Sequence, residues 1–221
     1  KVWSTNQFVD NYVLEGNIAF NGGSLSEYAS RKFNFFVVGN NPSAPARNLV
    51  VRNNYTFAGR TTTSPACNAF GPNYGVVDML LEGNLLLGQF RTTGPYVNCS
   101  IKHNRILGGT ALPFISGTGF AMTDYPENDY AQDLPTSGLD AFVRPNRYEP
   151  GRANIAIYNW SGADTVDVDI GGVGLNPGDR YQLIHAMDFY KDIITDTYRG
   201  GTIKVPMTGH SFAQAIGATK S

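Results

Sequence analysis

The chain has 221 residues, enough for one large domain or two small ones, and its formal net charge at pH 7 is −1. Only 16% of the residues are charged, so the chain lacks the basic surplus that binding to nucleic acid requires. It has no run of 18 apolar residues, and we therefore expect no membrane-spanning helix. Its 25 glycines, 12 tyrosines and 13 phenylalanines are typical of an all-β protein with many turns.

One short pattern recurs four times in the first half of the chain. It places apolar residues five and three positions before an asparagine and three positions after it, with glycine close behind. The asparagines are Asn17, Asn54, Asn84 and Asn104, at intervals of 37, 30 and 20 residues. Such a repeat indicates a solenoid in which the longer intervals carry inserted loops.

Asparagine suits this repeat for two reasons. It tolerates the left-handed backbone required where one strand bends sharply into the next. Stacked amide side chains can also hydrogen-bond to one another, which satisfies them inside the protein. Residues 1–115 therefore resemble the right-handed parallel β-helix, whose repeats carry an internal asparagine ladder. The alternative is an ordinary antiparallel β-domain with asparagines in its turns.

Charged residues stand two positions before each ladder asparagine. They are Glu15, Arg52, Glu82 and Lys102. Side chains alternate along a strand, so these four should form an outward-facing row of ion pairs. This half of the chain also resembles β-helix polysaccharide lyases, which abstract a sugar proton with Lys or Arg. That resemblance makes Arg52, Glu82 and Lys102 weak catalytic candidates and leaves calcium as an open cofactor, although the repeats lack a dense acidic cluster.

Aromatic side chains give a better indication of function, because exposed rings can stack on the apolar faces of sugars. Insertions in solenoids gather on particular faces, so residues 21–46 and 60–75 are the predicted binding surfaces. The candidate carbohydrate-binding residues are Trp3, Tyr28, Tyr74, Phe90 and Tyr96. Packing in the interior is the alternative for each of them.

The remaining chemistry-bearing residues predict no metal site or catalytic triad. Two cysteines are too few for a disulfide framework, and a bridge between Cys67 and Cys99 remains open. The three histidines are scattered through the sequence. Two acidic sets could hold calcium, but solvated charges that discourage aggregation are the commoner explanation. The sets are Asp164, Asp167 and Asp169, and Asp188, Asp192 and Asp196.

The character of the sequence changes towards the C-terminus. Residues 116–140 lack regular patterning and are interpreted as a connecting segment. Alternating strands separated by Gly and Pro turns then predict a small antiparallel β-sandwich over 141–221. The expected strands are 142–145, 153–158, 165–170, 181–185, 203–207 and 212–216. Segments 143–160 and 176–181 resemble the C-terminal β-sandwich of bacterial secreted β-helix proteins and carbohydrate-active enzymes, which implies an extracellular setting.

These observations predict an all-β chain, with right-handed parallel β-helix coils followed by a small antiparallel β-sandwich. The expected function is extracellular recognition or processing of a polysaccharide, with this segment as a carbohydrate-binding or accessory module. One alternative is a structural or assembly component of a surface layer, filament or adhesin. Another is a polysaccharide lyase or glycosidase with its active site partly in coils upstream of Lys1. Few residues precede the first repeat, so further coils or an N-terminal partner chain are expected there.

Overall fold

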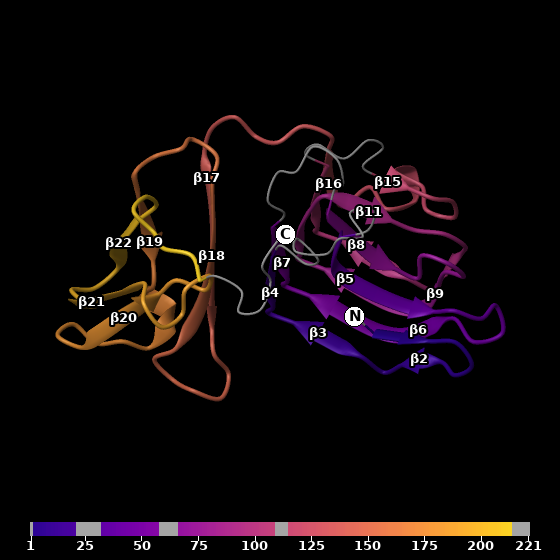
Figure 1. Cartoon of the computed structure of the whole chain (residues 1–221), viewed down its shortest axis with the longest axis horizontal. Coiled ribbons are helices and arrows are strands. Elements are labelled where there is room, and N and C mark those ends of the chain that lie inside the picture. Colours follow the sequence, from indigo (N-terminus) through magenta and orange to yellow (C-terminus); the bar gives the residue numbers. More distant parts are fainter. Residues whose placement is uncertain (1, 21–31, 58–65, 109–114, 214–221) are drawn as a thin grey trace, which may run out of the picture. The chain divides into compact units, whose positions relative to one another are not determined.

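The computed structural model describes residues 2–20, 32–57, 66–108 and 115–213. They form two compact units, Lys1–Leu134 and Pro135–Ser221 (Figure 1). Strands dominate both units, and the helical turns in the described part are two short 3-10 segments, Met122–Asp124 and Gly171–Val173. The all-β prediction is thereby confirmed. No helix of the described residues is long and apolar enough to cross a membrane.

Three sheets of parallel strands make up the first unit (Figure 1). The first sheet contains β1 (Val2–Ser4), β5 (Lys32–Gly39), β8 (Ala66–Phe70), β11 (Gln89–Arg91) and β15 (Ile115–Ser116). The second contains β2 (Val9–Asp10), β3 (Val13–Glu15), β6 (Ala46–Arg52), β9 (Val76–Glu82), β12 (Tyr96–Val97) and β13 (Ser100–Lys102). The third contains β4 (Ile18–Phe20), β7 (Tyr55–Phe57), β10 (Leu85–Leu87), β14 (Arg105–Leu107) and β16 (Asp129–Ala131).

The chain runs through these sheets in a repeating order, from the first to the second and then to the third. One such circuit through the three sheets is called a pass. The first unit extends beyond residue 115, where the sequence predicted its end. β16, in the predicted connecting segment, pairs in parallel with β14, so that Ile106 aligns with Tyr130. The tyrosine-rich stretch after residue 115 is therefore part of the first unit.

A sharp corner joins each strand of the second sheet to the third sheet. The residue before each ladder asparagine adopts a left-handed backbone: Gly16, Asn53, Gly83 and His103 have φ of 67°, 53°, 65° and 55°. Glycine and asparagine enter this region most readily. The expectation that the ladder asparagines themselves would be left-handed is wrong, because the preceding residue makes the bend.

The ladder asparagines form a continuous row of side-chain hydrogen bonds. Asn17 Nδ2 donates to Asn54 Oδ1 at 2.9 Å, and Asn54 Nδ2 donates to Asn84 Oδ1 at 2.9 Å. The row continues from Asn84 to Asn104 at 2.8 Å and from Asn104 to Asn128 at 2.8 Å. Asn128 is a fifth member that the sequence pattern did not reveal. Each acceptor oxygen also receives the backbone N–H of the preceding asparagine in the row.

The last four amides of the row, from Asn54 to Asn128, also reach a strand carbonyl of the neighbouring pass. Asn84 Nδ2 donates to the Val51 carbonyl at 2.9 Å, and Asn104 Nδ2 to the Leu81 carbonyl at 2.8 Å. Asn54, Asn84 and Asn104 are 0–2% exposed. Buried amides with all of these partners avoid the desolvation penalty that an unsatisfied polar group carries.

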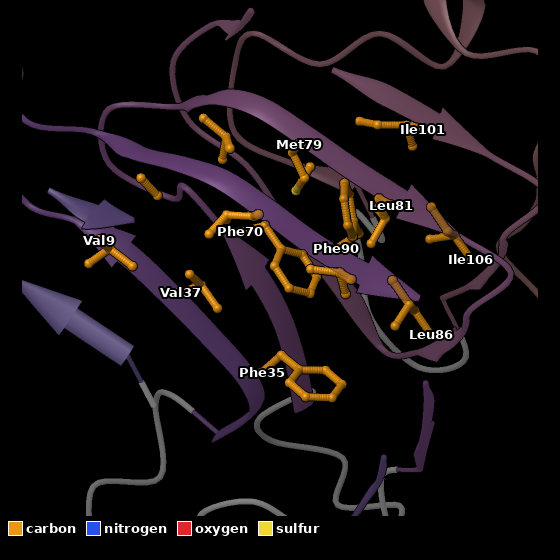
Figure 2. Close-up of a cluster of buried hydrophobic side chains, with 14 residues drawn as sticks. Val9, Phe35, Val37, Phe70, Met79, Leu81, Leu86, Phe90, Ile101 and Ile106 are labelled. Atoms are coloured by element: carbon orange, nitrogen blue, oxygen red, sulfur yellow. The ribbon is translucent and has the colours of Figure 1, made fainter. Parts of the chain in front are cut away.

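Apolar side chains from the three sheets fill the interior (Figure 2). A row of phenylalanine rings runs through it, with centroids 6.0 Å apart for Phe35 and Phe70, 6.2 Å for Phe70 and Phe90, and 5.2 Å for Phe90 and Phe120. Phe90 is 0% exposed, so its predicted role in stacking on sugars is wrong. Burial of a ring of this size contributes about 2 kcal/mol to stability.

Tyr96 also belongs to the packing of the first unit. Its ring lies against Phe120, with centroids 5.7 Å apart, and its hydroxyl donates to the Phe70 carbonyl at 2.6 Å. Burial raises the pKa of this hydroxyl well above its ordinary value. Its predicted role as a sugar platform is therefore not supported by its position.

Both cysteines are free thiols. Cys67 is buried and its Sγ lies 3.4 Å from Gln89 Oε1, whereas Cys99 is partly buried beside the carbonyls of Val76 and Val97. The open alternative of a Cys67–Cys99 bridge is thus not the arrangement in this structure.

The second unit consists of three antiparallel strand pairs (Figure 1). They are β17 (Leu139–Pro145) with β18 (Ala153–Asn159), β19 (Thr165–Asp169) with β22 (Thr202–Pro206), and β20 (Arg180–Ile184) with β21 (Ile193–Thr197). β21 was not predicted. The strand predicted at 212–216 is not present at residues 212–213, and its remainder lies outside the described residues.

Removal of a central ladder amide should destabilise the first unit more than removal of a terminal one. Asn84→Ala removes the acceptor of the buried Asn54 N–H and the side-chain donor to Asn104, and should lower the free energy of unfolding by about 3 kcal/mol. Asn17→Ala, at the exposed end, should lower it by about 1 kcal/mol or less. Urea unfolding followed by circular dichroism measures both. Equal losses would contradict the ladder's stabilising role.

The tyrosines beside Asn128 should make the first unit sensitive to alkali. Burial raises the pKa of Tyr130 to about 12, above the ordinary value of 10.0. The unfolded state therefore loses this proton first, and stability should fall as the pH rises from about 10 towards 12. Tyr130→Phe should reduce that fall in urea midpoints measured at about pH 8 and about pH 11. Tyr148→Phe, at a residue that is 86% exposed, is the control and should behave as the unmodified chain.

Candidate functional site

The outward face of the second sheet carries side chains in aligned rows. Strand register places Val13, Val50, Leu80 and Ser100 side by side, one from each pass. Their neighbours Val51, Leu81 and Ile101 point inward and are 0–3% exposed. Because side chains alternate, the first set faces outward, and Val13 is 61% exposed. The outer face therefore bears an aliphatic row that ends in a serine.

A second row on this face consists of asparagine and aspartate residues. Asn11, Asn48, Asp78 and Asn98 repeat at the same 37, 30 and 20 residue intervals as the ladder. All four have a left-handed backbone, with φ of 59°, 50°, 55° and 52°. The pairing of β6 with β9 is interrupted where Asn48 faces Asp78. The second sheet thus bends along one line, and each bend presents a short polar side chain.

An open groove of about 720 Å³ follows this line of bends. Its lining comprises the polar row, the aliphatic row with Ser100, and Leu49 and Met79 between them. Asp10 supports one wall: its carboxylate accepts from Arg47 Nε at 2.8 Å and from Asn48 Nδ2 at 2.7 Å. The bond from Arg47 holds the pKa of Asp10 below its usual value, although burial acts the other way. The groove is therefore lined by amides and aliphatic groups, with Asp78 as its one carboxylate among the described residues.

The catalytic candidates lie in the charged row, beyond the groove lining. Arg52 binds Glu15 through Nη2 and Nε, both at 3.0 Å, and Lys102 Nζ lies 3.7 Å from Glu82. The hydrogen bond with Glu15 raises the pKa of Arg52, which favours the guanidinium and opposes a role as base. The row has the geometry of cross-strand ion pairs.

The predicted aromatic platform is not assembled in the described residues. Trp3 and Tyr74 are 50% and 41% exposed, but neither lines the groove. Phe90 and Tyr96 pack inside the first unit. Tyr28 lies outside the described residues. The sequence interpretation missed the polar row, although its regular spacing is visible once the ladder is aligned.

A separate cluster of titratable groups lies in the second unit. His185, Asp192 and His210 present donor atoms within 4.8 Å of one another, so the prediction of scattered histidines is wrong for two of the three. His210 bonds to the Pro206 carbonyl at 2.9 Å and to Asp192 at 2.8 Å, and these contacts raise its pKa above the ordinary value. Burial acts to raise the pKa of Asp192, but bonds from His210 and Ser211 outweigh it and hold the value low.

Comparison with known proteins adds no functional assignment. The chain matches no family model, no curated protein and no solved structure. The function of the two units must therefore be inferred from the geometry and chemistry of their own residues.

The charged row should contribute to stability as ordinary surface ion pairs do. A double-mutant cycle with Glu15→Gln and Arg52→Met should give a coupling of about 0.5 kcal/mol. Urea unfolding in low and high salt measures it, and the coupling should shrink in high salt. A coupling above about 2 kcal/mol would show that the row does more than pair charges at the surface.

Proposed function

We propose that the first unit is a right-handed parallel β-helix and that the groove on its second sheet binds a polysaccharide. The repeating order of the three parallel sheets and the internal asparagine row support the fold. The resemblance of the C-terminal segments to secreted proteins supports an extracellular setting, and the antiparallel pairs of the second unit would form the accompanying sandwich.

The observation that carries the binding function is the composition of the groove. Exposed amides can donate to and accept from sugar hydroxyls, and aliphatic groups can pack against the apolar faces of the rings. The two rows advance together from strand to strand, at about 4.8 Å per step. A groove that repeats its chemistry in this way suits a polymer with repeating units better than a single small molecule.

Binding is favoured over polysaccharide cleavage by the chemistry of the groove. Hydrolysis of a glycosidic bond commonly uses two carboxylates that flank the bond. Asp78 is the one carboxylate among the described residues that line the groove. The basic residues proposed for lyase chemistry are engaged with Glu15 and Glu82. These features support a recognition module.

A lysine placed in the middle of the groove should block the polymer. Leu80 is only partly buried and faces outward, so Leu80→Lys should keep the fold and weaken binding at least about tenfold, or about 1.4 kcal/mol. Isothermal titration against neutral glucan, galactan and polyuronate polymers measures the affinity. Asp78→Asn keeps a residue that tolerates the left-handed backbone and tests the charge of the groove.

Lys102→Met is the matched control, because Lys102 lies on the same sheet beyond the groove. It should bind as tightly as the unmodified chain, with an unchanged circular dichroism spectrum. Unchanged affinity in Leu80→Lys would place the binding surface elsewhere. Failure to bind any of the three polymer classes would count against the proposal and favour a structural role in a surface assembly.

A further inference from the structure

The second unit brings two imidazoles and a carboxylate together from two segments, the turn between β20 and β21 and the segment after β22. His185 follows β20, Asp192 precedes β21, and His210 follows β22. The backbone N–H of His185 donates to the Asp192 carbonyl at 3.0 Å, which closes the turn between β20 and β21. The segment after β22 returns to this turn, where Ser211 N–H donates to Asp192 Oδ2 at 3.0 Å. Hydrogen bonds from these backbone N–H groups thus keep the two segments, and the three side chains they carry, close together.

The hydrogen bonds of His210 leave one of its ring nitrogens, Nδ1, as an acceptor that faces the acceptor oxygen of Asp192. Its Nε2 lies 2.9 Å from the Pro206 carbonyl, which can only accept, so Nε2 carries the proton there. In the neutral ring, Nδ1 then presents a lone pair towards Asp192 Oδ2 at 2.8 Å. Two lone pairs at this distance require a cation that contacts both atoms, which is either a proton on Nδ1 or a metal ion bound to both.

A second nitrogen lies near the same oxygen. His185 Nδ1 is buried, has no hydrogen-bond partner among the described residues, and lies 3.6 Å from Asp192 Oδ2. Zinc bound at about 2.0–2.2 Å by nitrogen and oxygen in a tetrahedron separates its ligands by about 3.4 Å. The distances from the two nitrogens to Asp192, 2.8 and 3.6 Å, lie on either side of this value.

We propose that His185, Asp192 and His210 bind a divalent transition metal ion, with Zn²⁺ as the best match. Two imidazoles with one carboxylate suit zinc and its neighbours in the first transition row better than calcium or magnesium, which prefer oxygen ligands. The site is independent of the groove in the first unit. Three protein ligands leave a fourth tetrahedral position for water or for a donor from another molecule.

The surroundings supply the outer shell that metal-binding side chains usually have. The Pro206 carbonyl orients His210, and Ser211 N–H orients Asp192. Ser211 Oγ donates to the buried Asp188 at 2.6 Å, which fixes the turn. The ring of Phe212 lies across His185, with centroids 5.7 Å apart.

Metal binding also requires a local change that can be measured. The two imidazole rings are stacked, with centroids 4.5 Å apart and planes 17° from parallel. An ion bound by both Nδ1 atoms should lie near both ring planes, so at least one ring must turn out of the stack. The imidazole resonances of His185 and His210 should therefore shift together when the metal binds.

Titration of the metal-free full chain with ZnCl₂ tests the site. One Zn²⁺ should bind per chain, and Co²⁺ in its place should give the intense visible absorption of a tetrahedral complex. Asp192→Asn and His210→Gln should weaken binding at least about a hundredfold, because each removes one of three ligands. His185→Phe keeps an aromatic ring beside His210 and Phe212 and retains the His210–Asp192 pair, so it should fold normally and still lose the metal.

His103→Asn is the matched control, since His103 lies in the first unit and its neighbour there is Glu127 at 3.7 Å. It should bind zinc as the unmodified chain does. The proposal is overturned if the unmodified chain binds no zinc at about 0.1 mM, far above the Kd that the binding free energy of structural zinc sites implies. It is equally overturned if a folded His185→Phe binds zinc as tightly as the unmodified chain.

Discussion

The structure of the first unit depends on one interaction, the hydrogen bond from each ladder amide to the next. A buried asparagine that lacks these partners would destabilise the interior, and one that has them fixes the distance and direction between successive strands. Asn54, Asn84 and Asn104 each combine a bond to the next amide with a bond to a strand carbonyl of the neighbouring pass. The corner of every pass is thereby held in register, whatever the length of the segment inserted between corners.

The groove depends on the same register. The exposed polar row has the same spacing as the ladder, six residues earlier in each pass, so the two rows are aligned by one constraint. Between them lie the aliphatic row, which faces outward, and its inward neighbours, which fill the core around Phe70 and Phe90. The surface that we propose for binding is therefore a face of the scaffold itself, and its chemistry repeats because the scaffold repeats.

The sequence predicted the parts of this arrangement that depend on local periodicity. Alternation and spacing identified the four ladder asparagines and the outward charged row. Asn128 escaped because its strand is short and lies in a stretch rich in Pro, Asp and Tyr, although Tyr125 and Ala131 occupy the expected flanking positions. The prediction for Phe90 was wrong because a new strand begins directly after Gly88. The position of Phe90 next to an insertion does not reveal whether its ring faces the interior or the solvent.

The sequence pattern did not predict which residues from separate turns lie close together in the fold. His185, Asp192 and His210 meet because β20 pairs with β21 and the segment after β22 folds back, and neither contact has a local signature. The same holds for the bend at Asn48 and Asp78, where the interruption arises between paired strands. Pairwise tertiary contacts of this kind create both of the sites that we propose.

Hydrogen exchange of the ladder amides tests the role of the ladder most directly. The backbone N–H groups of Asn54, Asn84 and Asn104 each donate to a neighbouring asparagine side chain, although they lie at corners between strands. We expect them to exchange as slowly as the core strand amides of Val51 and Leu81. Exchange at the rate of exposed turns, with the strands still protected, would contradict this role, because the corners would then open without the ladder holding them.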